Sequence, residues 1–376
     1  MRNLGCRFLR LLGRDDRGAV AVLVAVLLGG GVLLGMGALA IDVGQIYQNR
    51  AELQNGADSA ALAIARQCAQ GSCPASPVTV AGTYASANAS ALTQDSAGIS
   101  VVCGSDSMGS CASVVGSGLT NCPPDPPVGT HFVDVQTKTK LGNGSTLLPP
   151  VFAKTLVGGA TYNGTTVSAC AQAEWGPPSG ANSIAFTISG CEWDTATNNG
   201  QNYVSPYPPV PTNPGVDQVL TLHSGQTSGQ CQANPADSDA PGAFGWTQDM
   251  SGTCTVQITN NTYLTNTGVS AGNTCKGALQ TAWTNKSVVY VPVYKAVVGQ
   301  GNGTVYTLKG FAAFVITGYR VPGATGDDWL NSGLLCHPPD VCIDGFFTQG
   351  VLVSSPPGGG GGGTQNLGVY SFELTG

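Results

Sequence analysis

The chain has 376 residues, enough for two or three domains, and only 10% of them are charged, against about 25% in an ordinary soluble domain. Its 54 glycines and 23 prolines exclude a bundle of long soluble helices. A formal net charge of −6 and only three histidines argue against a basic nucleic-acid-binding face.

The N-terminal region predicts a membrane anchor. Residues 19–41 carry no charge, and as a helix rising ~1.5 Å per residue they would be long enough to cross a bilayer. Five basic residues precede this run, whereas the first charged residue after it is Asp42; the five are Arg2, Arg7, Arg10, Arg14 and Arg17. By the positive-inside rule, residues 1–18 are therefore expected in the cytoplasm and the body outside the cell membrane, which makes this a single-pass membrane protein.

A cleaved signal peptide is the alternative interpretation of the same run. Its apolar region is normally only ~7–15 residues long, but Ala38 and Ala40 have the spacing of a cleavage site, so processing after Ala40 stays open. Within the run, Gly31 and Gly35 are four residues apart and are candidates for close helix packing, with Asp42 as a third candidate at the membrane boundary.

Residues 42–67 predict a helical continuation outside the membrane. Apolar residues recur at helical spacing in this segment, on a face interrupted by Arg50. The face contains Ile46, Leu53, Ala57, Ala60, Ala61 and Ile64. We therefore expect one long rod that ends near Gln67, with Gly56 as a weak point costing ~1 kcal/mol relative to alanine.

Several of these residues form a recognisable pattern. Arg17 and Gly18 precede the apolar run, Asp42 follows it, and a further motif contains Leu53, Gln54, Asn55, Ala57, Asp58, Ala60, Ala61 and Leu62. Together they resemble the N-terminal segment of TadG-like proteins of the Flp (tight adherence) pilus system. The resemblance implies a cell-surface protein that assembles or anchors a pilus, with other pilus-assembly or pilin proteins and the membrane as its partners.

The same family comparison raises two further questions. Related pseudopilins are cut after a glycine and carry glutamate at the fifth mature position; a cut after Gly18 would place Leu23 there, so this processing stays open. Longer relatives carry a metal site that begins Asp-x-Ser-x-Ser, but the nearest candidate, residues 106–110, has Met108 where the first serine is needed. No such metal site is predicted.

The rest of the chain predicts an α+β fold with a mainly β body. Residues 68–178 are expected to form an α+β module, residues 179–355 a mainly β module, and residues 356–376 a glycine-rich linker that ends in a strand or in disorder. Helices are expected at 80–92 and 149–156. Strands are expected at 99–102, 131–138, 165–175, 184–189, 218–222, 255–258, 287–293, 305–308, 311–319 and 367–374, with a hairpin loop at 299–303.

The thirteen cysteines are divided by the predicted membrane crossing. Cys6 falls on the reducing side, and twelve remain outside, where they can form up to six disulfides. Short spacing favours three pairs: Cys68 with Cys73, Cys336 with Cys342, and, more weakly, Cys254 with Cys275. The segment 336–342 also contains His337, but without a second Cys/His pair nearby a disulfide is favoured over a metal half-site.

No group of residues predicts catalysis, a cofactor or a small-molecule substrate. The histidines are scattered and no Gly-x-Ser-x-Gly motif is present. Asp237 and Asp239 read as a solvated turn, because a calcium site needs six or more oxygen ligands. The sequence therefore favours a non-catalytic pilus-assembly protein, with a membrane-tethered exported adhesin or ligand-binding module as the alternative and an exported enzyme as a distant third.

Overall fold

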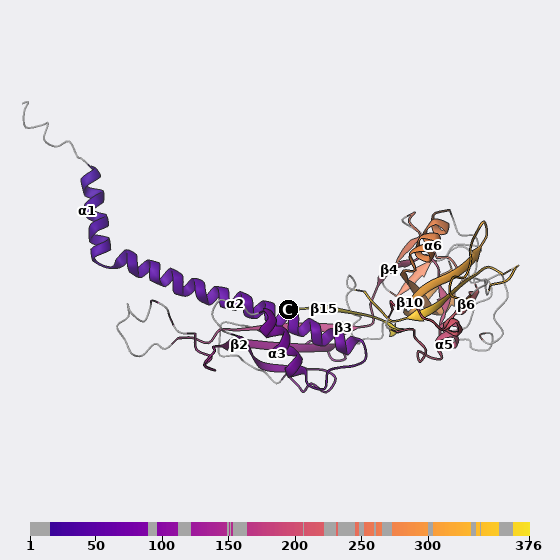
Figure 1. Ribbon diagram of the computed structural model, residues 1–376, viewed down its shortest axis with the longest axis horizontal. Coiled ribbons are helices and arrows are strands. Elements are labelled where there is room, and N and C mark those ends of the chain that lie inside the picture. Colours follow the sequence, from indigo (N-terminus) through magenta and orange to yellow (C-terminus); the bar gives the residue numbers. More distant parts are fainter. Residues whose placement is uncertain are drawn as a thin grey trace, which may run out of the picture.

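The molecule is elongated, with two N-terminal helices leading into a first module and a second module at the far end (Figure 1). The computed structural model describes residues 16–88, 96–111, 122–148, 150, 152, 164–205, 207–221, 231, 245–247, 252–258, 261–264, 273–299, 304–331, 336–338, 340–352 and 364–376. The mixture of helices, sheets and disulfides agrees with the predicted α+β class.

The expected single N-terminal rod is wrong, because the helix is interrupted by glycines. Helix α1 spans Asp16–Gly29 and α2 spans Val32–Ala69. Between them Gly31 adopts a left-handed conformation with φ 71°, which glycine accepts without steric cost. The N–H of Gly31 bonds to the carbonyl of Leu28, which closes α1 and turns the chain into α2.

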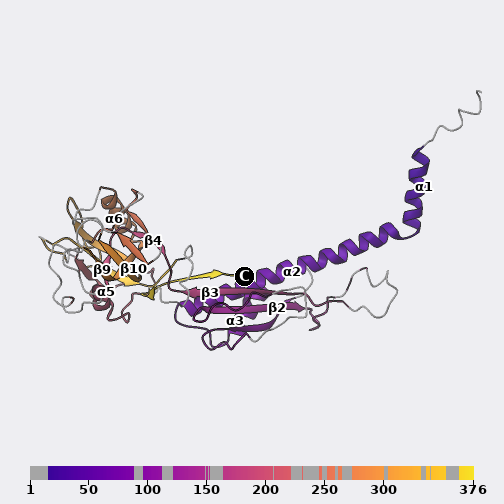
Figure 2. The ribbon, with the colours of Figure 1, turned by 180° about the vertical axis from the view of Figure 1, so that it is seen from behind.

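The interruption also bears on the predicted membrane crossing. The two helices are set at an angle to each other, as both views show (Figures 1 and 2). Among the residues that the structure describes, no helix is both long enough and apolar enough to cross a membrane.

The first module is a five-stranded sheet covered by helices. Its strands are β1 (Ser96–Gly104), β2 (His131–Lys140), β3 (Ser168–Gly176), β13 (Gly350–Val351) and β15 (Val369–Leu374). They lie in the order β1-β2-β3-β15-β13. Neighbours are antiparallel except β13 and β15, which are parallel. Helix α3 (Pro77–Asn88) packs beside the C-terminal half of α2.

The chain returns to this first sheet at its C-terminus. After the second module, β14 (Gln365–Asn366) leads to β15, which pairs with β3 so that Phe372 lies opposite Trp175. Of the two alternatives left open for the tail, strand or disorder, the structure has the strand. The sheet of the first module is therefore completed by residues more than 190 positions away from β3 (Figure 2).

Small side chains explain how α2 lies on this sheet. Ala57, Ala60, Ala61 and Ala65 are fully buried against valines and alanines of β2 and β3. Since alanine adds little bulk, the helix can approach the sheet closely while still removing its apolar face from water.

The second module is built around strand β10 (Val305–Val321). It lies in an eight-stranded sheet whose main path is β5-β9-β10-β12-β6, while β8, β11 and β14 pair with β10 off that path. The flanking strands are β5 (Ile188–Ser189), β6 (Gln218–Thr221), β8 (Thr262–Leu264), β9 (Val288–Val298), β11 (Ala324–Gly326) and β12 (Cys342–Thr348). A separate two-stranded sheet joins β4 (Ala181–Ile184) to β7 (Thr255–Ile258).

Two predicted strands are joined in β10, which corrects the expected break between residues 308 and 311. Irregular pairing with β9 at Thr307, Leu308 and Gly310 accommodates the glycine without ending the strand. Nearly every side chain of β10 is buried, because both faces of the sheet are covered.

Among the residues that the structure describes, the second module also contains the helices α5 (Gly190–Thr197) and α6 (Asn273–Asn285) and the short 3₁₀ helix η1 (Pro214–Val216). The Ser189 hydroxyl and the Glu192 carboxylate form a capping box at the start of α5. Of the expected helix at 149–156 the structure describes only Pro150 and Phe152, which are not helical. The loop at 300–303 and the turn with Asp237 and Asp239 lie outside the described residues.

Candidate functional site

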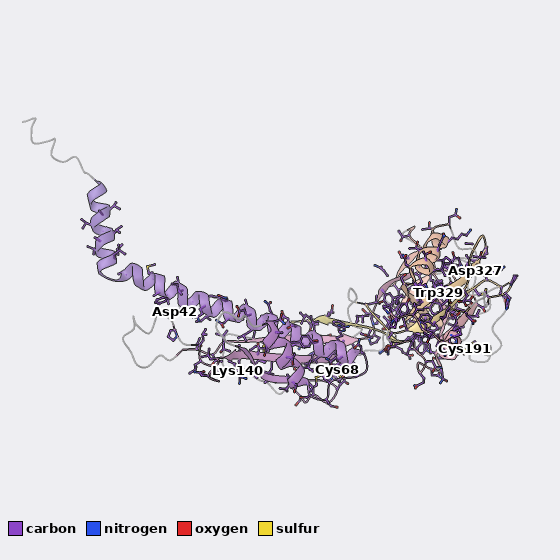
Figure 3. The ribbon with its side chains drawn as sticks, viewed as in Figure 1. Asp42, Cys68, Lys140, Cys191, Asp327 and Trp329 are labelled. Atoms are coloured by element: carbon purple, nitrogen blue, oxygen red, sulfur yellow. A yellow bond between two sulfur atoms is a disulfide. The ribbon has the colours of Figure 1, made fainter. Side chains whose placement is uncertain are left out.

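The most unusual surface of the molecule is the apolar surface of α1. Six large apolar side chains of this helix are between 40% and 67% exposed: Val20, Val22, Leu23, Val24, Val26 and Leu28. At 100° per residue they point in all directions around the helix. Figure 3 shows side chains projecting from both sides of α1 and not reaching the body. A helix that is apolar all round requires an apolar environment.

The first half of α2 also exposes large apolar side chains on more than one side. They are Val32, Met36, Leu39, Ile41, Val43 and Tyr47. Five of them recur every three or four residues along one side, and Ile41 lies on the opposite side. Ala38 and Asp42, between these two sides, are buried. This half of α2 therefore contacts its own chain at Ala38 and Asp42 and exposes apolar side chains on its other sides.

The second half of α2 contains the predicted motif, which holds the helix on the body. Leu53, Ala57, Ala60 and Ala61 are buried, and Leu62 is partly buried at the edge of the same core. A Cβ on Gly56 would lie 3.1 Å from the carbonyl oxygen of Ala85 in α3. The glycine that looked like a weak point in the sequence is thus where two helices touch.

Polar residues of the motif fix the position of the helix. The Gln54 side-chain amide donates hydrogen bonds to Asp58 Oδ1 and to the main-chain oxygen of Cys170, both at 2.8 Å. The Thr137 hydroxyl of β2 donates to the main-chain oxygen of Leu53 at 3.0 Å. Asn55 is exposed. Most residues of the motif therefore contribute to the packing of α2 on the sheet.

The predicted helix-packing residues Gly31, Gly35 and Asp42 lie at the start of α2 or in its first half. Asp42 accepts the main-chain N–H of Phe152 with both carboxylate oxygens, at 3.1 and 3.2 Å, so it binds a loop of its own chain. Gly31 precedes the first turn of α2 and does not share a continuous helix face with Gly35. Arg17 and Gly18 lie in the first turn of α1.

All twelve cysteines from Cys68 onward are paired, in six disulfides. Three are the pairs that spacing favoured: Cys68–Cys73, Cys254–Cys275 and Cys336–Cys342. The other three are Cys103–Cys111, Cys122–Cys170 and Cys191–Cys231. Their partners are up to 48 residues apart, and only the fold brings them together.

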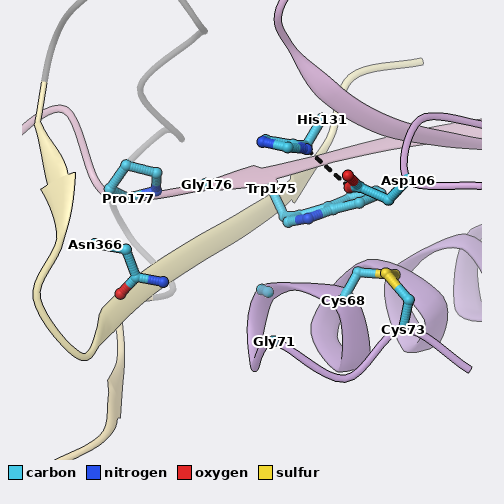
Figure 4. Close-up of a pocket in the computed structure, with 10 residues that line it drawn as sticks. Cys68, Gly71, Cys73, Asp106, His131, Trp175, Gly176, Pro177 and Asn366 are labelled. Carbon is cyan, nitrogen blue, oxygen red and sulfur yellow. Dashed lines mark hydrogen bonds and ion pairs between the residues drawn. A yellow bond between two sulfur atoms is a disulfide. The ribbon is translucent and has the colours of Figure 1, made fainter. Parts of the chain in front are cut away.

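A hollow of about 400 Å³ lies where α2 ends against the sheet (Figure 4). His131 Nδ1 lies 2.8 Å from Asp106 Oδ2, and the His131 ring stacks on Trp175 with centroids 5.9 Å apart. The Cys68–Cys73 disulfide borders the same hollow. The sequence does not indicate this pair, because 25 residues separate the histidine from the aspartate and no local pattern links them.

The hollow contains part of a catalytic arrangement. An aspartate on Nδ1 orients a histidine so that Nε2 can accept a proton. Among the described residues that line the hollow, however, none has a hydroxyl or a free thiol to act as a nucleophile. The arrangement as described can orient an imidazole but lacks the group that the imidazole would activate.

Metal ligation finds little support in the same part of the structure. Cys103, Cys111 and Asp134 place possible ligand atoms within 4.8 Å of one another, but both sulfur atoms belong to a disulfide. Burial raises the pKa of Asp134 to about 6, while a hydrogen bond from Gln172 lowers it. His337 lies beside the Cys336–Cys342 disulfide, whose sulfurs are likewise unavailable as thiolates.

Buried acidic residues form a second group that the sequence did not indicate. Asp217, Asp328 and Asp344 are all more than 90% buried in the second module. The Thr317 hydroxyl donates to Asp217 at 2.8 Å, and the main-chain N–H groups of Leu330 and Asn331 donate to Asp328. Burial and the neighbouring carboxyls of Asp328 and Asp344 hold the pKa of Asp217 well above its usual range.

Comparison with known families identifies the N-terminal segment. Residues 18–67 match the family described as "Putative Flp pilus-assembly TadE/G-like". No curated protein and no solved structure matches the chain. The segment that includes α1 and most of α2 is thus TadE/G-like, as the sequence motif predicts, and this family supports a role in pilus assembly.

Proposed function

We propose that this protein is a single-pass membrane protein that assembles or anchors a Flp-type pilus. The apolar segment 19–41 anchors it, residues 1–18 lie in the cytoplasm and the body is outside. It acts without catalysis, by packing of its N-terminal helices and by contacts of its body with other pilus proteins.

One observation carries the proposal: the family segment has two halves with opposite roles. Its C-terminal half, around Gln54 and Ala61, is buried against the body. Its N-terminal half exposes apolar side chains all round α1 and on more than one side of the first half of α2. The family segment is thus attached to the first module at its C-terminal end and has exposed apolar side chains at its N-terminal end. This arrangement is expected of a helix that is inserted in a bilayer and packs against other helices.

The disulfides support the location of the body. Six disulfides form and persist in an oxidising compartment and are rare in the cytosol. Cys6 is the one cysteine placed on the other side of the membrane by the proposal.

Cys6 makes the orientation testable in the native protein. A membrane-impermeant maleimide should leave the protein unlabelled in intact spheroplasts and add a single label after detergent permeabilisation. Cys6→Ser is the control, because it should abolish the label. Labelling of Cys6 before permeabilisation would overturn the orientation.

Charged substitutions in α1 test the role of the apolar segment 19–41. Leu23→Asp together with Val26→Asp should remove the protein from the membrane fraction and abolish surface pili, because two charges in a helix centre oppose insertion. The control is Val210→Asp with Leu374→Asp, which places the same charges at exposed apolar positions of the body. Normal pili with the α1 variant would contradict the proposal.

A further inference from the structure

The first module has a pair of lysines at the end from which the N-terminal half of α2 projects. Lys138 and Lys140 lie at the C-terminal end of β2 and, because they are two residues apart, point to the same face of the sheet. Figure 3 shows Lys140 at the same end of the module as Asp42, whereas Cys68 is at the opposite end. The net charge of the whole chain is −6, so a pair of positive charges here is a local departure from an acidic average.

The cross-strand neighbours of both lysines are uncharged. Lys138 lies between Gly98 of β1 and Ser168 of β3, and Lys140 is opposite a serine of β1. Among the described residues, no carboxylate forms an ion pair with either lysine. On this face of β2 the nearest acidic residue is Asp134, four residues before Lys138 and therefore about 13 Å away along the strand. The two ammonium groups are available to an anion from outside the chain.

The acidic residues in the neighbouring part of α2 are bound elsewhere. Asp42 is buried and accepts the main-chain N–H of Phe152 with both carboxylate oxygens. Glu52 accepts a hydrogen bond from the Gln48 amide at 3.2 Å. In the part of the chain that the structure describes, neither carboxylate is an ion-pair partner of the β2 lysines.

An exposed apolar side chain follows the lysines in sequence. The chain turns at residues 141–145, directly after Lys140. Leu147 comes next and is 43% exposed, whereas Leu148 is buried in a small core against which Ile46 of α2 packs. The turn and Leu147 therefore lie beside α2 near the level of Ile46.

A second exposed apolar side chain, Phe152, is held at the level of Asp42. The Phe152 N–H is bound by Asp42, and the Phe152 side chain is 42% exposed. The proposed membrane segment 19–41 ends one residue before Asp42, and Ile46 is only about 7 Å beyond that end for a helix that leaves the bilayer along its normal. The headgroup layer outside the hydrocarbon core is about 5–7 Å thick. Leu147 and Phe152 are therefore placed at the depth of the headgroups.

We propose that Lys138, Lys140, Leu147 and Phe152, which we call the proximal surface, dock on anionic phospholipid headgroups of the bilayer that holds residues 19–41. The ammonium groups bind lipid phosphates, and the two apolar side chains enter the headgroup layer. Basic residues combined with exposed Leu and Phe are typical of surfaces that bind at a membrane interface. The proximal surface also adjoins the apolar part of α2, whereas an acidic protein would match the lysines alone. The inference rests on the proposed function, because segment 19–41 sets the position of the bilayer.

Fluorescence quenching on the full chain in lipid nanodiscs tests this docking. A fluorophore is attached to Asn143→Cys, at an exposed position of the turn 141–145, in a Cys6→Ser background. The discs contain phosphatidylcholine alone or with about 30% phosphatidylglycerol, together with a lipid that carries a nitroxide quencher on its headgroup. We expect quenching to be at least about twofold stronger in the anionic discs. In about 1 M salt it should fall to the level of the neutral discs, because salt screens exposed charges.

Variants locate the surface. Lys138→Gln with Lys140→Gln should lower quenching in anionic discs to the level of neutral discs, and Leu147→Ser with Phe152→Ser should lower it in both. Lys276→Gln with Lys295→Gln is the matched control, because it removes the same charge from the second module and should leave quenching unchanged. Thermal unfolding checks that each variant is folded.

The outcomes separate this inference from the proposed anchor. Equal quenching in the two kinds of disc, or full quenching in the folded Lys138→Gln/Lys140→Gln variant, would overturn the inference while the protein still co-elutes with the discs. An acidic protein would then be the better partner for the lysines. A chain that does not co-elute with either kind of disc would overturn the membrane anchor and the inference together.

Discussion

Gln54 of α2 donates a hydrogen bond to the main-chain oxygen of Cys170 in β3 at 2.8 Å, across 116 positions of sequence. The same amide nitrogen also contacts Asp58 one helical turn later. This hydrogen bond attaches α2, whose N-terminal half has exposed apolar side chains, to the five-stranded sheet of the first module. A motif residue of the TadE/G-like segment thus serves as the attachment point between the two.

Loss of this contact should loosen α2 from the sheet. Gln54→Met keeps the length of the side chain and removes the donor, so the partly buried oxygen of Cys170 loses its bond to the helix. We expect a loss of about 1–3 kcal/mol in the free energy of unfolding, measured by urea denaturation. Gln48→Met is the control, because the Gln48–Glu52 bond is exposed, and it should change stability by less than about 0.5 kcal/mol. Equal effects of the two variants would contradict this role.

Two glycines of the same helix should respond in opposite ways to alanine. Gly44 has open space around its Cβ position, so Gly44→Ala should stabilise the protein by up to about 1 kcal/mol through helix propensity. A Cβ on Gly56 would meet main-chain atoms of Ala85 at 3.1 and 3.2 Å. Gly56→Ala should therefore destabilise the protein by about 1–3 kcal/mol. Thermal or urea unfolding of both variants measures these changes. Stabilisation by Gly56→Ala would contradict the prediction, because it would show that α3 can move away from α2 without a cost in stability.

Local periodicity explains which parts of the fold could be predicted. Leu53, Ala57 and Ala61 recur at helical spacing, and they are the buried face of α2. The strand at 131–138 alternates with period two and is found as β2. Cys68 and Cys73 are close enough in sequence that a turn after the helix brings them together.

Long-range relations explain what could not be predicted. The pairing of β15 with β3 and the Cys122–Cys170 disulfide depend on the packed fold, and no local pattern records them. The His131–Asp106 pair likewise combines distant segments. The break at Gly31 has a local cause: the apolar run by itself predicts one continuous helix, but three successive glycines favour an end to the helix.

The returning strand should matter for the first module. Tyr370 of β15 is buried in the core that α2 forms with the sheet. Tyr370→Ala leaves a cavity there and should cost about 3–5 kcal/mol. Leu374→Ala, at a position 40% exposed on the same strand, should cost much less. Hydrogen exchange of β3 amides would report the loss directly, and unchanged protection in Tyr370→Ala would show that β15 is dispensable.

The buried aspartates predict an unusual dependence of stability on pH. Because burial and neighbouring carboxyls raise the pKa of Asp217 in the folded state, its proton is held there but lost from the unfolded chain above about pH 4. Stability contributed by the protonated form is therefore lost as the pH rises from about 4 through the raised pKa. Asp217→Asn keeps the shape and cannot ionise, so its advantage over the native protein should grow with pH, to a few kcal/mol (~2–4) in alkaline buffer.

Thermal unfolding between pH 5 and 9 measures this difference. Asp340→Asn is the matched control, because Asp340 is an exposed aspartate of the same module, and its curve should follow that of the native protein. The native protein should become less stable relative to Asp217→Asn at each higher pH. A constant difference across the range would mean that Asp217 ionises alike in the folded and unfolded chains, and that the buried carboxyls do not share their environment as the structure describes.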